Sequence, residues 1–144
     1  MVVFDVRARL LSQKKYMKTF LFILTSFVAV TSLLSGLFMI SNPGGEFFNL
    51  SIRLLNGTPF RDFRIPGILL ASLVGITNFV AALFIIIRQQ KQYSWSLAGG
   101  IALCGWVIAE IAMIDTQYWL HFIYLTAGIL IILVSLRLKG KDLI

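Results

Sequence analysis

Four long apolar runs constrain this chain more than any other feature of its sequence. They occupy residues 19–40, 65–87, 94–114 and 119–138, and the first two contain no charged residue. Each run has about 20 residues, enough for a helix rising about 1.5 Å per residue to cross a hydrocarbon core of roughly 30 Å. Because backbone amides find no water inside a bilayer, each run is expected to be helical. The sequence therefore predicts an all-α membrane protein, a bundle of four transmembrane helices.

Composition supports a membrane protein over a soluble one. The chain is 58% hydrophobic and 13% charged, whereas soluble domains are about 45–50% apolar and about 25% charged. The net charge of +7 raises the possibility of a nucleic-acid partner. However, the basic residues lie in the tails and at the ends of the runs, and they form no basic face interleaved with aromatic residues. We therefore expect no nucleic-acid partner.

The distribution of Lys and Arg predicts how the bundle is oriented. Of the 13 Lys and Arg residues, ten lie in the first 18 residues, in the connection after residue 87 and from residue 137 onward, and three lie in 41–64. Since cytoplasmic segments carry the excess of these residues, the tails 1–18 and 139–144 are predicted to be cytoplasmic and the loop 41–64 to be external. The expected location is the cell (inner) membrane, in a multi-pass arrangement. The first run exceeds the roughly 7–15 apolar residues of a signal peptide, so we expect it to be a retained anchor.

The outer loop 41–64 leads into TPFRDFRIPG, residues 58–67, which combines charge with stiff backbone. Its middle part, 46–57, is apolar and is expected to form a short helix or an extended segment. This part serves either as a lid on the bundle or as a surface that contacts lipid or a partner. Pro66 suits the first turn of the second helix. Asp62 suits the positive end of that helix, and two arginines flank it at the level of the headgroups.

A polar cluster is predicted at the outer end of the bundle. Glu110 lies about one turn inside the third run, and His121 lies just inside the fourth. Charge at that depth is costly unless it is paired, so we expect Glu110 to meet Arg61 or Arg64. Trp106 precedes Glu110 by four positions and shares its helix face. The candidate cluster consists of Arg61, Asp62, Arg64, Trp106, Glu110, Trp119 and His121.

Three functions are compatible with this cluster. In the first, the protein is a non-enzymatic accessory or lipid-interacting bundle whose polar cluster is mainly structural. In the second, it is a small transporter or a protein that binds an anionic headgroup or solute through Glu110 with Arg61 or Arg64. In the third, it is a lipid-modifying membrane enzyme that uses Glu110 and His121. The sequence contains no metal-ligand spacing, Ser-His-Asp set or phosphate loop, so we predict no catalytic residue, metal or cofactor, and the first function is favoured.

Small residues predict where helices pack closely. Gly67, Ala71 and Gly75 recur at four-residue steps in the second helix, which allows another helix to approach. The stripe serves either the bundle itself, a homo-oligomer or a larger membrane complex. Asn78 lies near the middle of the same helix and is expected to form a hydrogen bond to a neighbouring helix. The lone Cys104 is expected to be a buried packing residue.

Residues 56–136 resemble a widespread group of small bacterial four-helix membrane proteins. The resemblance rests on TPFRDFRIPG (58–67), RQQKQYSW (88–95), GWVIAEIAMI (105–114) and QYWLHFIYLTAGIL (117–130). It implies a single compact four-helix unit and no known activity. Small sterol-isomerase-like and DoxX-like families share this size, but the paired acids and histidines of an isomerase site are missing here, so no such site is carried over.

Overall fold

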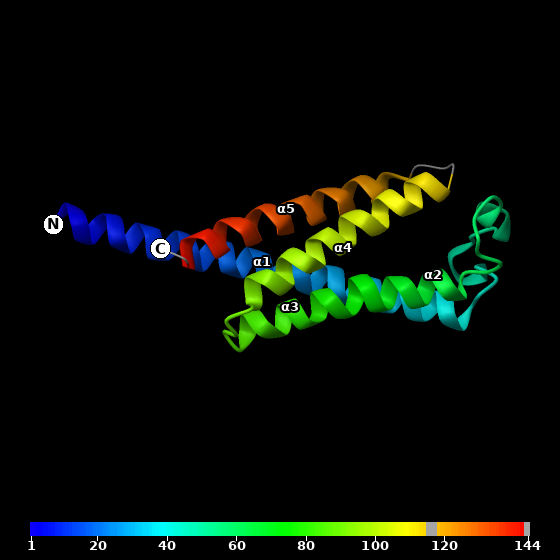
Figure 1. Ribbon diagram of the computed structural model, residues 1–144, viewed down its shortest axis with the longest axis horizontal. Coiled ribbons are helices and arrows are strands. Elements are labelled where there is room, and N and C mark those ends of the chain that lie inside the picture. The colour runs from blue at the N-terminus through cyan, green and yellow to red at the C-terminus, as the bar shows by residue number, and fades with distance from the viewer. Residues whose placement is uncertain (115–117, 143–144) are drawn as a thin grey trace.

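The computed structural model describes residues 1–114 and 118–142, and every regular element in this part of the chain is helical (Figure 1). Four of its helices are long and apolar enough to cross a membrane. The elements are α1 (Val2–Ser41), the short turns η1 (Glu46–Phe48) and η2 (Ile52–Leu55), α2 (Arg64–Leu69), η3 (Leu70–Ile76), α3 (Thr77–Ile86), α4 (Gln92–Met113) and α5 (Trp119–Asp142). The elements α2, η3 and α3 form one continuous helix over 64–86.

The predicted all-helical fold with four candidate spans is confirmed, and the helix ends differ from the predicted ones by few residues except in α1. This helix has 40 residues and begins at Val2, where only a basic tail was predicted. The first 18 residues contain no Gly or Pro to interrupt the helix. Asp5 and Arg9, one turn apart, form an ion pair with an Oδ2–Nη2 distance of 3.0 Å. At about 1.5 Å per residue, α1 is about 60 Å long, so its N-terminal part extends beyond the other helices (Figure 1).

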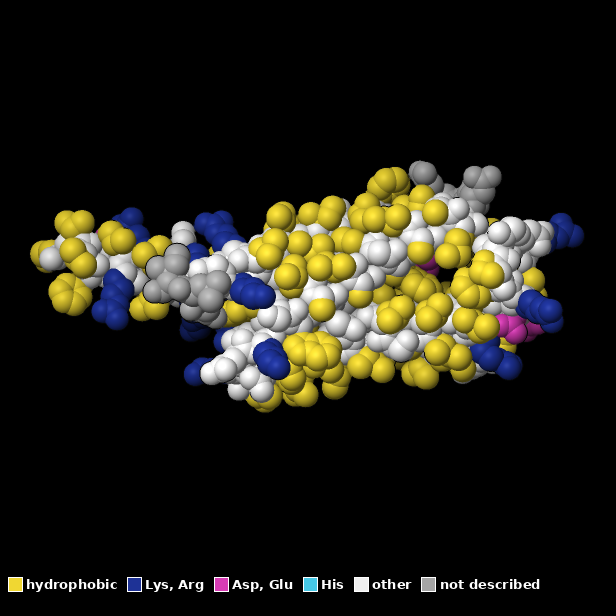
Figure 2. Space-filling model, viewed as in Figure 1, with side chains coloured by type: hydrophobic (Ala, Val, Ile, Leu, Met, Phe, Trp, Pro, Cys, Tyr) yellow, Lys and Arg dark blue, Asp and Glu magenta, His cyan; other side chains and the backbone are white. Residues whose placement is uncertain are grey.

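The helices pack as two layers with a shared core. α1 packs along the helix 64–86, α4 packs most extensively on α5, and α3 joins the layers by packing on α4. Both termini point to one end, and the loop 41–64 lies at the other (Figure 1). Lys and Arg side chains gather toward the two ends, while the middle is covered by apolar side chains (Figure 2). The buried core includes Leu21, Val28, Val74, Leu103, Val107, Ile131 and Leu138.

The small-residue stripe of the second helix packs against α1. A Cβ atom added to Gly67 would lie 2.8 Å from the carbonyl oxygen of Gly36, and one added to Gly36 would lie 2.7 Å from both the Gly67 oxygen and the Ala71 Cβ. A Cβ atom on Gly75 would lie 2.8 Å from Leu33. The stripe therefore serves the internal bundle, and Gly36, which was not among the predicted packing residues, is its partner on α1.

Asn78 links the second helix to α4. Its side chain is fully buried, and its Nδ2 donates to the Val74 carbonyl at 2.9 Å and to the Gly99 carbonyl of α4 at 3.2 Å. A Cβ atom on Gly99 would lie 2.6 Å from the Asn78 Oδ1, so the two helices approach closely at this point. Cys104 packs its sulfur against Gly128 of α5, where an added Cβ would lie 2.6 Å from Sγ.

The loop 41–64 folds back over the end of α1. The Phe38 and Phe47 rings stack with centroids 4.2 Å apart, and the Phe63 N–H donates to the Pro43 carbonyl at 3.0 Å, which closes the loop. Within the loop, the side chains of Leu55 and Phe63 are buried. The segment 46–57 thus consists of two short 3₁₀ turns rather than one helix or strand. Its predicted position at a membrane interface stays a prediction.

Candidate functional site

A cavity of about 540 Å³ lies between the helix 64–86 and α4, under the loop 41–64. One wall contains Leu69 and Leu73, and the opposite wall contains Ala102, Gly105 and Met113 of α4. In the space-filling view the molecule is hollowed near the end that carries the loop, and an acidic side chain is visible in the hollow (Figure 2). We call this space the α2–α4 cavity.

A second cavity of about 340 Å³ lies between α1, α4 and α5. Its wall contains Thr31 and Ser35 of α1 and Leu120 and Tyr124 of α5. We call it the α1–α5 cavity. Residues 70–76 form a π-helical stretch rather than a regular α-helix. Of these residues, Leu70 lines the α1–α5 cavity and Leu73 lines the α2–α4 cavity. Such stretches are rare and occur frequently at functional sites, because the extra residue shifts the side chains that follow.

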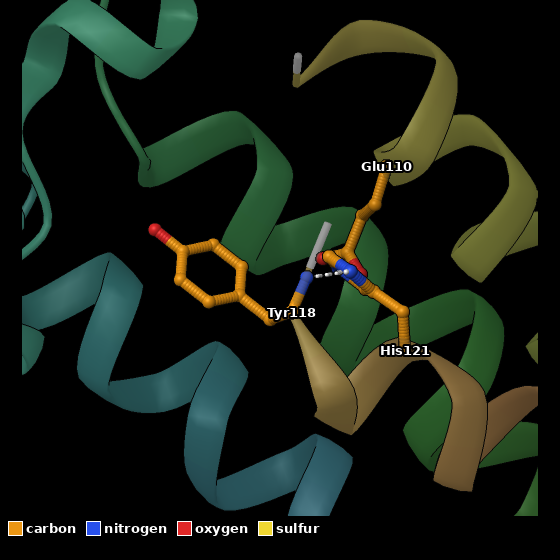
Figure 3. A network of polar contacts seen from close by, with 3 residues as sticks. All are labelled: Glu110, Tyr118 and His121. Atoms are coloured by element: carbon orange, nitrogen blue, oxygen red, sulfur yellow. Dashed lines mark hydrogen bonds and ion pairs between the residues drawn. The ribbon is translucent and has the colours of Figure 1, made fainter. Parts of the chain in front are cut away.

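Glu110 and His121 meet in the wall that the two cavities share. Glu110 projects from α4 and His121 from the first turn of α5, and they point toward each other (Figure 3). The His121 Nε2 lies 3.6 Å from the Glu110 Oε2, and the two side chains are 11% and 26% exposed. Trp106, one turn earlier on α4, lines both cavities together with Glu110. A contact of 3.6 Å is too long for a direct hydrogen bond, so the carboxylate keeps capacity to accept one from a ligand.

The backbone at the start of α5 fixes the orientation of His121. Tyr118 directly precedes the helix, and its backbone N–H donates to the His121 Nδ1 at 3.1 Å (Figure 3). His121, the third residue of α5, thereby accepts the backbone N–H of the residue that precedes the helix. Glu or Gln at the same position does this in a capping box. Because Nδ1 accepts a hydrogen bond, the proton of the neutral imidazole resides on Nε2 and faces Glu110.

Among the described residues that line either cavity, Glu110 is the one charged side chain, and none is Lys or Arg. Its carboxylate accepts hydrogen bonds, while the His121 Nε2–H and the Trp106 N–H donate them. The rest of the walls is mostly aliphatic and aromatic. This arrangement suits a molecule that is mainly apolar and carries a small polar group.

The predicted pairing of Glu110 with Arg61 or Arg64 is wrong. Both arginines are exposed, and within 1–114 and 118–142 no ion pair joins either of them to Glu110. Arg61 precedes α2 and Arg64 is its first residue. Glu110 lies about one turn from the end of α4, and its neighbour is His121 of the adjacent helix α5. Asp62 accepts the Arg64 backbone N–H at 3.0 Å in a local turn that leads into α2.

The structure thus brings together three of the seven predicted cluster residues: Trp106, Glu110 and His121. Trp119 is 69% exposed and lines neither cavity. Tyr118 was missed as a site residue, although it lines both cavities and supplies the N–H that orients His121. The spacing of Tyr118 and His121 at the start of a helix was the available signal, since a side chain three positions into a helix reaches back to the cap residue.

Within the described residues, no group of three or more His, Cys, Asp or Glu side chains is placed to hold a metal ion. Comparisons with protein-family models, with curated proteins and with solved structures find no match to this chain. The resemblance of residues 56–136 to small bacterial four-helix membrane proteins therefore stays a prediction.

Proposed function

We propose that this chain is a non-enzymatic, multi-pass membrane protein that binds an amphiphilic lipid in the α2–α4 cavity. The observation that carries the proposal is the cavity itself, whose volume of about 540 Å³ falls within the roughly 300–1,000 Å³ of small-molecule sites. Gly105, on its α4 wall, is exposed, and an added Cβ there would have no atom within 4 Å. The cavity thus opens sideways, on the face of the helices that would meet lipid tails.

The polar wall supports binding rather than catalysis. The His121 Nδ1 accepts the Tyr118 backbone N–H, and Nε2 carries the ring proton, so neither nitrogen has a free lone pair. A general base needs a free nitrogen within reach of the proton that it removes. The alternative of an anionic headgroup held by Arg61 and Arg64 is not supported either, because neither arginine lines a cavity.

The charge distribution supports a location in the cell membrane with both termini in the cytoplasm. The end that carries the termini also carries ten of the 13 Lys and Arg residues. With this orientation the loop 41–64 and both cavities face the outer half of the bilayer. An accessory role within a homo-oligomer or a larger membrane complex is compatible with this proposal.

Filling the α2–α4 cavity should remove the bound lipid. In Gly105→Leu, the new side chain enters the cavity without meeting another atom at its Cβ. We expect lipid retained by the protein purified in mild detergent, measured by native mass spectrometry, to fall about tenfold, the effect of losing about 1.4 kcal/mol of binding free energy. Ala98→Leu is the matched control, because Ala98 is exposed two turns away on the same helix and lines neither cavity. Equal lipid occupancy in all three proteins would refute the proposal.

The orientation has its own test. In a Cys104→Ala background, we expect Asn56→Cys to react with a membrane-impermeant maleimide in intact cells, because Asn56 is exposed in the loop 41–64. Lys139→Cys, exposed near the other end, should react only after the membrane is permeabilised. The reverse pattern of labelling would show that the termini are external.

A further inference from the structure

The α2–α4 cavity and the α1–α5 cavity adjoin at a common wall. The second cavity reaches from this wall to α1 and α5. The polar groups of the site lie at the junction, and the space on either side is largely apolar. The residues that line both cavities are Met39, Leu50, Trp106, Glu110, Tyr118 and His121.

The arrangement around the junction matches a molecule with two apolar arms that meet at a polar centre. A ligand with one arm would fill one cavity and leave the apolar walls of the other without contacts, which is unfavourable in a packed bundle. With volumes of about 540 Å³ and about 340 Å³, each cavity is within the size range of a small-molecule site.

The polar groups at the junction indicate the chemistry of that centre. Glu110 can accept hydrogen bonds, whereas the His121 Nε2–H and the Trp106 indole can donate them. A hydroxyl group both donates and accepts, so it can satisfy both kinds of partner. An ammonium group offers donors alone and would face two donors. A phosphate would face the Glu110 carboxylate, and no Lys or Arg in the described part of either lining would compensate the negative charge.

We propose that the two cavities form one site for an uncharged, hydroxyl-bearing lipid with two acyl chains, of the diacylglycerol type, with its hydroxyl at Glu110 and His121. This inference rests on the proposed function and adds the class of ligand. One chain occupies the α2–α4 cavity and the other occupies the α1–α5 cavity, while the glycerol lies at the junction.

The test compares three probes on the purified, delipidated full chain by native mass spectrometry: dioleoylglycerol, monooleoylglycerol and dioleoyl phosphatidic acid. We expect dioleoylglycerol to bind about tenfold more tightly than either of the others, because monooleoylglycerol lacks an arm and the phosphate is repelled. Equal binding of monooleoylglycerol would overturn the two-armed site, and equal binding of phosphatidic acid would overturn the uncharged centre.

Two variants test whether each cavity holds one acyl chain of the ligand. Ser35→Phe places a ring in the α1–α5 cavity, which Ser35 lines, and Leu34→Phe is its control because Leu34 is exposed and lines neither cavity. We expect Ser35→Phe and Gly105→Leu each to reduce dioleoylglycerol binding about tenfold. If Ser35→Phe unfolds, Ser35→Leu replaces it, with thermal unfolding as the check.

The outcomes separate this inference from the proposed function. Loss of dioleoylglycerol in Gly105→Leu with unchanged binding in the Ser35 variant would overturn the two-armed site and leave the single-cavity lipid site standing. Failure of all three probes to bind, together with no retained lipid in the protein as purified, would overturn both.

Discussion

Replacing Gly36 with leucine should destabilise the protein strongly. A Cβ atom at this position would lie 2.7 Å from the Ala71 Cβ and 2.7 Å from the Gly67 carbonyl oxygen. The Gly67 oxygen is a backbone atom and the Ala71 Cβ is attached directly to the backbone, so side-chain rotation can move neither of them. The helix α1 must therefore separate from the second helix. Overpacking of a core costs about 1–3 kcal/mol, and more where the backbone must move. We expect the upper part of that range, measured as a lowered midpoint of thermal unfolding in a fixed detergent.

Gly105→Leu is the matched control for this prediction. It is the same substitution in another long apolar helix of the same protein, but an added Cβ at Gly105 meets no atom within 4 Å. We expect its unfolding midpoint, measured after delipidation, to stay near that of the unsubstituted protein. If Gly36→Leu unfolds at the same temperature as this control, the close approach of α1 to the second helix is not present in the protein.

Replacing His121 with leucine should also have a large effect, for a different reason. The substitution leaves the Tyr118 backbone N–H without its acceptor and removes the partner of Glu110. Loss of a helix cap costs about 0.5–2 kcal/mol, and a partly buried polar group left without a partner costs about 1–3 kcal/mol. We expect the free energy of unfolding to fall by about 1–3 kcal/mol.

His121→Gln separates the two contributions. A glutamine three positions into a helix can accept the N–H of the cap residue, so this variant should recover much of the stability lost in the leucine variant. Equal destabilisation by glutamine and leucine would show that the contact with Glu110, and not the cap, stabilises this end of α5. Equal stability of all three proteins would contradict the geometry at Tyr118.

The sequence predicted the helices well because a long apolar run has few choices of structure. A run of about 20 apolar residues can satisfy its backbone in lipid only as a helix, so span positions follow from hydropathy. The packing stripe through Gly67 was also predictable, since its four-residue spacing places the small residues on one face. Two features were not predicted. The extension of α1 to Val2 lies in a mixed polar and apolar segment, and the π-helical stretch 70–76 has no local sequence signature.

The candidate site was predicted in part. The depth of Glu110 and His121 placed them at one level, but hydropathy carries no information on which side chains face each other. The expected partner for Glu110 was an arginine, because an ion pair with a basic side chain lowers the free-energy cost of burying a carboxylate. The structure instead uses the neighbouring helix α5, from which His121 faces Glu110. The cavities could not be predicted, because they arise from how α2 and α4 diverge beneath the loop 41–64.

The central claim is that an amphiphile occupies the α2–α4 cavity, and photolabelling with a diazirine-bearing fatty alcohol tests it most directly. This single-chain probe does not depend on the two-armed site. In the delipidated protein we expect residue-level mass spectrometry to locate the label on half-buried cavity residues such as Leu69, Ala102 and Ala109, and we expect Gly105→Leu to lose that label. Labelling confined to outward-facing residues such as Ile101 and Ile108, and unchanged in Gly105→Leu, would contradict the claim.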